Sequence, residues 1–304
     1  MFDRWNDPTR PTQGPDQAMA AEQFGKYRLL RLLAQGRCEV YEAELDNTRQ
    51  RVALKIFPRR DSVPPTPTRM QREAGVATRA LTNAAAPHWV LIDDVGEIDG
   101  RLYLQMPLIE GIDLRALLAQ QGPLTPARAV AVLGQVAAAV DTAHAAGLVS
   151  REIATENILI DRDGFAYLLC RPYAPPLDHT GQPDHTFHLT EGSAAPEALT
   201  GTVDDHIRAA TYSLACVLYE CLTGAPPFPS GDASQQVIGH LTKDPPEPSY
   251  ANPAVPPAFD GVIARGMVKK PKYRYASGKA LTEAASAALQ WPADPVRKNK
   301  HKAR

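Results

Sequence analysis

Residues 195–228 read APEALTGTVDDHIRAATYSLACVLYECLTGAPPF, and the fold is inferred outward from this stretch. Its apolar run predicts a helix over Ala210–Leu222. A long helix before it begins at Thr125-Pro126, because threonine caps a helix and proline suits the first helical position, and it stops at Gly147. Three further helices are predicted after residue 222, at 235–241, 259–267 and 278–289. The C-terminal part of the chain is therefore mainly helical.

The N-terminal part of the chain has a different pattern. Short apolar runs bounded by turn residues predict strands, which lie at 29–33, 40–43, 52–56, 89–95 and 102–106. One helix, Thr68–Leu81, lies among them, and two more short strands bracket Asp161–Gly164. This order predicts an α+β fold of two lobes, in which an antiparallel sheet with one helix is followed by a mainly helical lobe.

The composition is that of an ordinary soluble globular protein. The 304 residues are 44% hydrophobic and 22% charged, and a net charge of −1 provides no field that would attract nucleic acid. The four cysteines lack the spacing of a zinc or redox site, so we expect reduced thiols in the cytoplasm. The most apolar stretch, residues 127–149, contains charged side chains and is too polar to span a membrane.

The two ends of the chain differ from its middle. Residues 1–24 are polar and rich in proline, glutamine and aspartate, which predicts a disordered tail. Residues 291–304 are basic, which predicts either a solvated tail or a juxtamembrane segment that precedes a membrane span. The predicted domain covers residues 25–290, with an N-lobe at 25–107 and a C-lobe at 108–290.

Short motifs, taken in order, resemble those of the eukaryotic-type Ser/Thr protein kinases. They are Val52-Ala53-Leu54-Lys55, Arg72-Glu73-Ala74, Glu156-Asn157-Ile158-Leu159, Ala195-Pro196-Glu197, Tyr212-Ser213-Leu214 and Arg274-Tyr275-Ala276-Ser277. The chain is most similar to the cytoplasmic domains of actinobacterial, notably mycobacterial, receptor Ser/Thr kinases. The resemblance implies the two-lobed protein-kinase fold, a cytoplasmic location and a membrane tether beyond the C-terminus of the domain.

The resemblance also implies a nucleotide site on residues that the chain keeps. Lys55 and Glu73 match the ion pair that places the ATP-binding lysine, although the pair alternatively serves only to hold the helix against the sheet. The remaining positions of this site are Gly36, Val40, Ala53, Met106, Pro107, Ile109, Asn157 and Leu159. Binding of ATP or adenine is expected to be either weak and metal-independent or absent, and no cofactor is expected to be required.

The phosphate-binding loop is the first of three places where the chain departs from the family. Only Gly36 is kept of the glycines that let backbone amides approach phosphate. Glu39 would bring a carboxylate near the phosphates, where like charges repel, unless its side chain points into solvent. Either arrangement predicts a weakened cradle.

The metal site is the second departure. Cys170-Arg171-Pro172 stands where the family has Asp-Phe-Gly. A thiol is a poor ligand for Mg²⁺, which prefers hard oxygen atoms. Asn157 keeps the position of the second metal ligand, but one amide oxygen does not hold Mg²⁺ alone, so no metal site is expected.

The catalytic loop is the third departure. Ser150-Arg151-Glu152 stands where the family has His-Arg-Asp, and Glu152 carries the carboxylate one methylene further from the backbone. A displacement of about 1 Å can lower a rate roughly 100-fold. The lysine that contacts the transferred phosphate is replaced by Ala154, and the aspartate that holds this loop is replaced by Ala210.

The region after the metal motif matches the activation segment of the family. Thr180 and Thr186 are predicted phosphorylation sites with Arg151 as a partner, and an unmodified loop is the alternative. A tyrosine of the substrate-binding turn is replaced by Ser193. In the family the residues matching Glu197 and Arg274 form a structural ion pair.

The kept scaffold and the altered chemistry together predict a catalytically inactive or severely impaired pseudokinase, which is not an enzyme and which regulates or scaffolds Ser/Thr kinase signalling. Its expected partner is an active Ser/Thr kinase or another signalling protein, and a homodimer is a further option. Two alternatives stay open. One is an active kinase that uses Glu152 as the base and Asn157 as a metal ligand, and the other is transfer of a different group, such as a nucleotidyl moiety.

Overall fold

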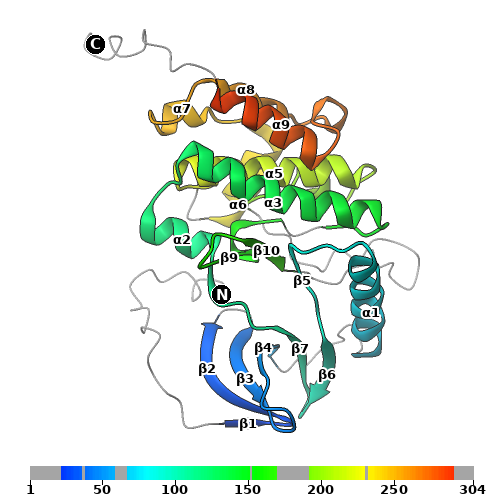
Figure 1. Cartoon of the computed structure of the whole chain (residues 1–304). Coiled ribbons are helices and arrows are strands. Elements are labelled where there is room, and N and C mark those ends of the chain that lie inside the picture. The colour runs from blue at the N-terminus through cyan, green and yellow to red at the C-terminus, as the bar shows by residue number, and fades with distance from the viewer. Residues whose placement is uncertain are drawn as a thin grey trace. The chain divides into compact units, whose positions relative to one another are not determined.

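The structure is a computed structural model that describes residues 22–35, 38–58, 67–150, 153–169, 192–229 and 232–290, with the main chain alone for 67–73. It divides into two compact units. The described residues up to 71, together with 92–108, make the first unit, and residues 72–91 with those from 109 onward make the second. Figure 1 shows the elements of both.

The first unit is built on a six-stranded antiparallel sheet of order β1-β2-β3-β4-β7-β6. The strands are β1 (Glu22–Phe24), β2 (Tyr27–Gln35), β3 (Glu39–Leu45), β4 (Arg51–Ile56), β6 (Asp94–Ile98) and β7 (Arg101–Pro107). Because side chains alternate along a strand, one face of the sheet buries its own core. This core includes Phe24, Tyr27, Leu29, Tyr41, Val52, Leu54 and Tyr103.

The second unit is mainly helical. Its longer helices are α2 (Leu114–Gln121), α3 (Pro126–Ala145), α5 (His206–Thr223), α6 (Ala233–Thr242), α8 (Ala258–Gly266) and α9 (Gly278–Leu289). Its short helices are α4 (Pro196–Leu199), α7 (Pro248–Ala251), η1 (Thr155–Asn157) and η2 (Pro271–Tyr273). Helix α1 (Pro67–Asn83) joins the core of this unit through Leu81, which is 1% exposed.

A small sheet completes the second unit. Its order is β5-β10-β9-β8, where β5 (Trp89–Val90) runs parallel to β10 (Ala166–Leu169). The strands β9 (Ile158–Asp161) and β8 (Gly111–Asp113) pair antiparallel with their neighbours. The Trp89 indole N–H donates to the Ala139 carbonyl on α3 over 2.9 Å, so this sheet is also fixed to the helical core.

The predicted α+β class, with a strand-rich part and a helical part, is confirmed. The long helix begins where its caps predict, since the Thr125 hydroxyl accepts from the Arg128 N–H, and Gly147 follows its end with a φ of 75°. Helix α5 begins four residues before the predicted Ala210, because Asp205 caps it by accepting from the Arg208 N–H.

The strand predicted at 89–95 is wrong as a single element. Residues 89–90 pair with β10 in the second unit, whereas the chain from Asp94 pairs with β7 in the first. The stretch therefore divides between two sheets, and Asp93 and Asp94 mark the end of its apolar part, where the second strand begins. Strands β1 and β8 and helix α2 were not predicted.

Candidate functional site

In the first unit, four residues of the predicted nucleotide site share one face of the sheet. Val40 lies directly across from Lys55, and Ala53 lies directly across from Met106. Residues paired across strands face the same side, and Ala53 and Lys55 are two positions apart on β4, so the two pairs share a face. The Lys55 ammonium lies 5.6 Å from the centroid of the Phe57 ring. These four residues provide three apolar side chains and one cation.

Glu39 is tied to a cation in the first unit. Its carboxylate pairs with the Arg101 guanidinium at 2.5 Å, and each side chain is 29% exposed. The Arg101 Nε–H also donates to the Phe57 carbonyl, which links the ends of β3, β4 and β7. The sequence predicts Glu39 either beside the phosphates or in solvent. The structure adds an ion pair in which the Arg101 cation offsets the charge of the Glu39 carboxylate.

In the second unit, the segment after the predicted catalytic residue is almost fully buried. Ile153, Ala154, Thr155 and Asn157 are each at most 4% exposed. The Asn157 N–H donates to the Ala154 carbonyl over 2.9 Å and closes η1, and Leu159 follows on β9. Ser150 is half-buried before this segment.

Two side-chain contacts of this segment were not predicted. The Thr155 hydroxyl donates to a Glu220 carboxylate oxygen on α5 over 3.0 Å. The Ser193 hydroxyl donates to the Ile153 carbonyl over 2.8 Å. Burial raises the pKa of the Glu220 carboxyl above its usual value. The contacts join residues far apart in the chain, so no local spacing indicates them. Ala210, also on α5, is buried and offers only a methyl group.

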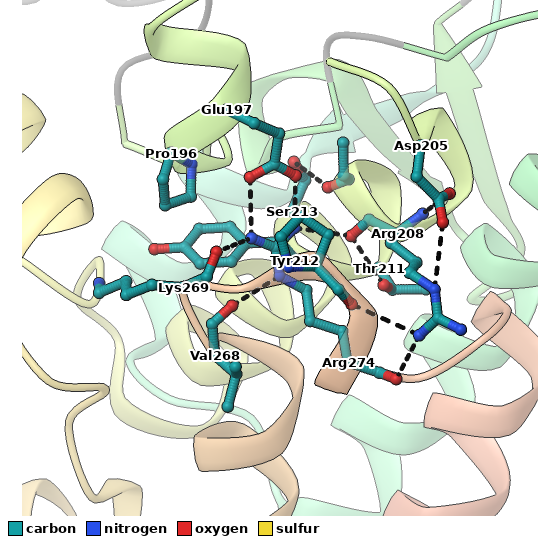
Figure 2. Close-up of polar contacts among 12 residues, drawn as sticks. Pro196, Glu197, Asp205, Arg208, Thr211, Tyr212, Ser213, Val268, Lys269 and Arg274 are labelled. Atoms are coloured by element: carbon teal, nitrogen blue, oxygen red, sulfur yellow. Dashed lines mark hydrogen bonds and ion pairs between the residues drawn. The ribbon is translucent and has the colours of Figure 1, made fainter. Parts of the chain in front are cut away.

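Arg274 and Glu197 form the most complete polar site of the second unit (Figure 2). Two guanidinium N–H groups donate to the two carboxylate oxygens, at 2.5 and 2.8 Å. The other three donate to the carbonyls of Val268, Lys269 and Arg208, at 2.7, 2.8 and 3.0 Å. Arg274 is fully buried, and every N–H group of its guanidinium has an acceptor.

Arg208, on α5, also donates a hydrogen bond to the main chain of Arg274. It donates to the Arg274 carbonyl over 2.8 Å while Asp205 holds its Nε at 3.1 Å. The Tyr212 ring lies under the Arg274 guanidinium, 4.8 Å from its central carbon to the ring centroid. Helix α4, helix α5 and the chain that flanks η2 are therefore fixed to one another.

The chain matches the family model described as a protein kinase domain over residues 27–284. It belongs to the protein kinase family. The kinase motifs at Lys55, Asn157, Glu197 and Arg274 all lie inside the matched range.

Several curated proteins are similar to this kinase-family chain. Serine/threonine-protein kinase PknE of Mycobacterium bovis is 45% identical over 284 residues, which is 91% of this chain and 48% of PknE. PknD of Mycobacterium tuberculosis is 47% identical over 275 residues, 88% of this chain and 40% of PknD. PknH of Mycobacterium bovis is 45% identical over 276 residues, 88% of this chain and 45% of PknH. The chain spans about half the length of these relatives.

These relatives correct one prediction. The altered motifs led us to expect that the chain is not an enzyme, but the similar proteins are named serine/threonine-protein kinases. The expectation of a non-enzyme is therefore wrong. The replaced residues are single side chains, whereas the identity of 45–47% extends over 88–91% of the chain.

Several predicted kinase positions lie outside the described residues. They are Gly36, Arg151, Glu152, Cys170, Arg171, Pro172, Thr180, Thr186 and the side chain of Glu73. Pro107 ends β7 in the first unit, and Ile109 belongs to the second unit. Within the part of the chain that the structure describes, no three His, Cys, Asp or Glu side chains gather where they could hold a metal ion. Among the described helices, none has the length and apolar character needed to cross a membrane.

Proposed function

We propose that this chain is a serine/threonine protein kinase domain that transfers the γ-phosphoryl group of ATP slowly to a serine or threonine hydroxyl. The observation that carries the proposal is its identity of 45–47%, over 88–91% of the chain, with proteins named serine/threonine-protein kinases. Because the chain spans about half of those proteins, their activities and substrates enter here only as part of the proposal.

The shared face of the first unit supports nucleotide binding. Val40 and Ala53 offer apolar contact to a purine ring, and Lys55 offers a cation to its phosphates. Glu39 adds little repulsion toward phosphate, because it lies across from Ile56, on the opposite face of the sheet from the pair of Val40 and Lys55, and its carboxylate is paired with Arg101. Weak binding of ATP through its adenine ring is the expected result.

The second unit would supply the groups that act on the acceptor hydroxyl. Glu152 would accept the proton, and the buried Asn157 would orient the reacting groups from the end of η1. The family's metal positions fall on Asn157 and on Cys170. One amide oxygen is not a site for Mg²⁺, so no step is assigned to a metal.

The replaced residues set the expected rate. Losing a charge-stabilising group lowers turnover about 1000-fold, and a displaced base lowers it about 100-fold. Starting from a kinase turnover of about 1–100 s⁻¹, the result is on the order of 10⁻⁵ to 10⁻³ s⁻¹. The chain is expected to be a slow enzyme.

Radiolabelled transfer at high protein concentration tests this proposal, with modified residues identified by mass spectrometry. We expect slow transfer by the wild-type chain and loss of transfer in Glu152→Ala and Lys55→Met. Lys279→Met is the matched control, because Lys279 is an exposed residue of α9 that pairs only loosely with Glu283, at 3.9 Å. Equal labelling by wild type and Glu152→Ala would attribute the signal to a contaminating kinase and overturn the proposal.

Nucleotide binding is tested separately by thermal shift. A ligand raises apparent stability by RT ln(1 + [L]/Kd), so a weak ligand gives a small shift that grows with its concentration. We propose a small shift with ATP that needs neither Mg²⁺ nor Mn²⁺ and that Ala53→Trp removes by filling the slot. A shift that appears only with a metal would show that a cation site exists, contrary to this part of the proposal.

Regulation and partners complete the proposal. An active Ser/Thr kinase would phosphorylate Thr180 and Thr186 of this chain, and a homodimer is the other assembly we propose. A cytoplasmic location with a membrane tether after the domain accords with the basic residues 291–304. Recovery of an active kinase with the tagged full chain, and loss of phosphate from Thr180→Ala and Thr186→Ala, would support the partner. Unmodified threonines in cells would contradict it.

A further inference from the structure

The buried loop of residues 153–157 needs partners for its polar groups. Its members Ile153, Ala154, Thr155 and Asn157 are almost without solvent contact. Buried backbone and side-chain polar groups are bonded in native proteins, so the partners of this loop decide where it lies. Asn157, at its end, is the residue through which the proposed reaction would be oriented.

The first partner lies on α5. The wholly buried Thr155 donates its hydroxyl to the Glu220 carboxylate over 3.0 Å. Thr155 is the first residue of η1 and Asn157 the last. The Ile158 N–H donates back to the Thr155 carbonyl, so a shift of Thr155 moves the turn that carries Asn157.

The second partner lies in the segment before α4. The buried Ser193 donates its hydroxyl to the Ile153 carbonyl over 2.8 Å. Ile153 directly follows Glu152 in the sequence. The loop is therefore bonded at both neighbours of Ala154. Ile153 accepts a hydrogen bond from Ser193, and Thr155 donates one to Glu220 on α5.

Helix α5 offers the loop an acceptor at Glu220 but not at Ala210. Ala210 is buried and presents a methyl group, whereas Glu220 presents a carboxylate. We propose that Thr155, bonded to Glu220 and assisted by Ser193, is the positioning residue that holds Asn157 in place for phosphoryl transfer. This inference rests on the proposed function, since it names the residues that place its reacting groups.

The variant Thr155→Val tests the inference because it replaces a hydroxyl with a methyl of nearly the same size. A loop displaced by about 1 Å should lower kcat roughly 100-fold. The KM for ATP should stay unchanged, because adenine and phosphate contacts lie on β3, β4 and β7. Thr155→Ser keeps the hydroxyl and should restore kcat. Ser193→Ala removes the other tether and should lower kcat in the same direction, which keeps the test available should Thr155→Val not fold.

Thr142→Val is the matched control, since the Thr142 hydroxyl donates to the Ala138 carbonyl within α3. It should leave kcat unchanged. A fall in kcat that Thr155→Ser does not reverse, or that Thr142→Val shares, would indicate a general loss of structure and overturn the positioning role.

Amide hydrogen exchange in the full chain separates this inference from the proposed function, because it needs no turnover. In Thr155→Val, the amides of Asn157 and Ile158 should exchange at least about tenfold faster while those in the middle of α5 stay unchanged. A wild-type chain that transfers no phosphate overturns the proposed function. Unchanged exchange, or an unchanged kcat beside an active wild type, overturns the positioning role alone.

Discussion

The Arg274 centre and the loop of residues 153–157 lie in the same unit, but they are held by different kinds of bond. The centre uses a bidentate ion pair with Glu197 and three charged donors to carbonyls. The loop uses two hydroxyl groups, Thr155 and Ser193. Removing Arg274 would leave a buried carboxylate without its counter-ion, whereas removing either hydroxyl would take away a single hydrogen bond. Damage to the centre should therefore unfold the unit, whereas damage to the loop should mainly change a rate.

The largest expected effect follows from removing the cation of the centre. Arg274→Met leaves the Glu197 carboxylate buried without its partner and should lower the free energy of unfolding by about 3–5 kcal/mol. Arg274→Lys should recover little, because an ammonium does not reproduce two parallel bonds to a carboxylate. Urea unfolding followed by circular dichroism measures the difference.

The control for Arg274 is Arg265→Ala. Arg265 is exposed and its guanidinium lies over the Tyr275 ring, 4.4 Å from the centroid, so its loss should cost at most about 1 kcal/mol. The double variant Glu197→Leu with Arg274→Met should be more stable than Arg274→Met alone. Equal destabilisation by Arg265→Ala and Arg274→Met would remove the contrast between the centre and an ordinary surface arginine.

The next effect depends on pH and comes from a buried histidine beside the centre. His240 Nδ1 bonds the Tyr212 hydroxyl at 2.9 Å, and burial, followed by the charge of Lys269, lowers the pKa of His240 to about 4. The folded protein therefore keeps His240 neutral, while the unfolded chain protonates it below the ordinary histidine pKa of 6.5. Stability is full above pH 6.5 and falls as the pH drops toward 4, by about 3 kcal/mol in total.

Urea unfolding of the wild type and of His240→Gln between pH 4.5 and 7 isolates the contribution of His240 to the stability. Other titrating groups are common to both proteins and cancel in the difference. The wild type should lose stability faster than His240→Gln as the pH falls. Parallel pH profiles would show that His240 is accessible to protons in the folded state, and the neighbourhood of the centre would then be less closed than its contacts indicate.

The sequence predicts the fold best where local chemistry decides it. The caps Thr125 and Gly147 bound α3, and their roles depend on the residue type alone. It fails at residues 89–95, where tertiary pairing divides a stretch predicted as one strand between two sheets. It also missed α2, although Asp113 caps that helix by accepting from the Ala116 N–H, because the cap follows a short strand.

The candidate site shows the same limit. The sheet face with Val40, Ala53 and Lys55 follows from the motif and its strand period, so the sequence indicates it. The contacts of Glu39 with Arg101 and of Thr155 with Glu220 join residues 62 and 65 positions apart. Only the tertiary structure brings such pairs together, and this is why neither the partner of Glu39 nor the partner of Thr155 was predicted.

The smallest expected effect compares two glycines of α8 and sharpens the distinction between packed and open parts of the second unit. A Cβ added at Gly266 would lie 2.5 Å from the Ala215 Cβ on α5, whereas one added at Gly261 would meet no atom within 4 Å. Gly266→Ala should therefore lower stability by about 1–3 kcal/mol through overpacking. Gly261→Ala should raise it by roughly 0.5–1 kcal/mol, because alanine loses less backbone entropy in a helix. Thermal unfolding of the two variants measures these opposite changes in stability. An increase in stability for both variants would mean that the contact of α8 with α5 is looser than the distance between Gly266 and Ala215 requires.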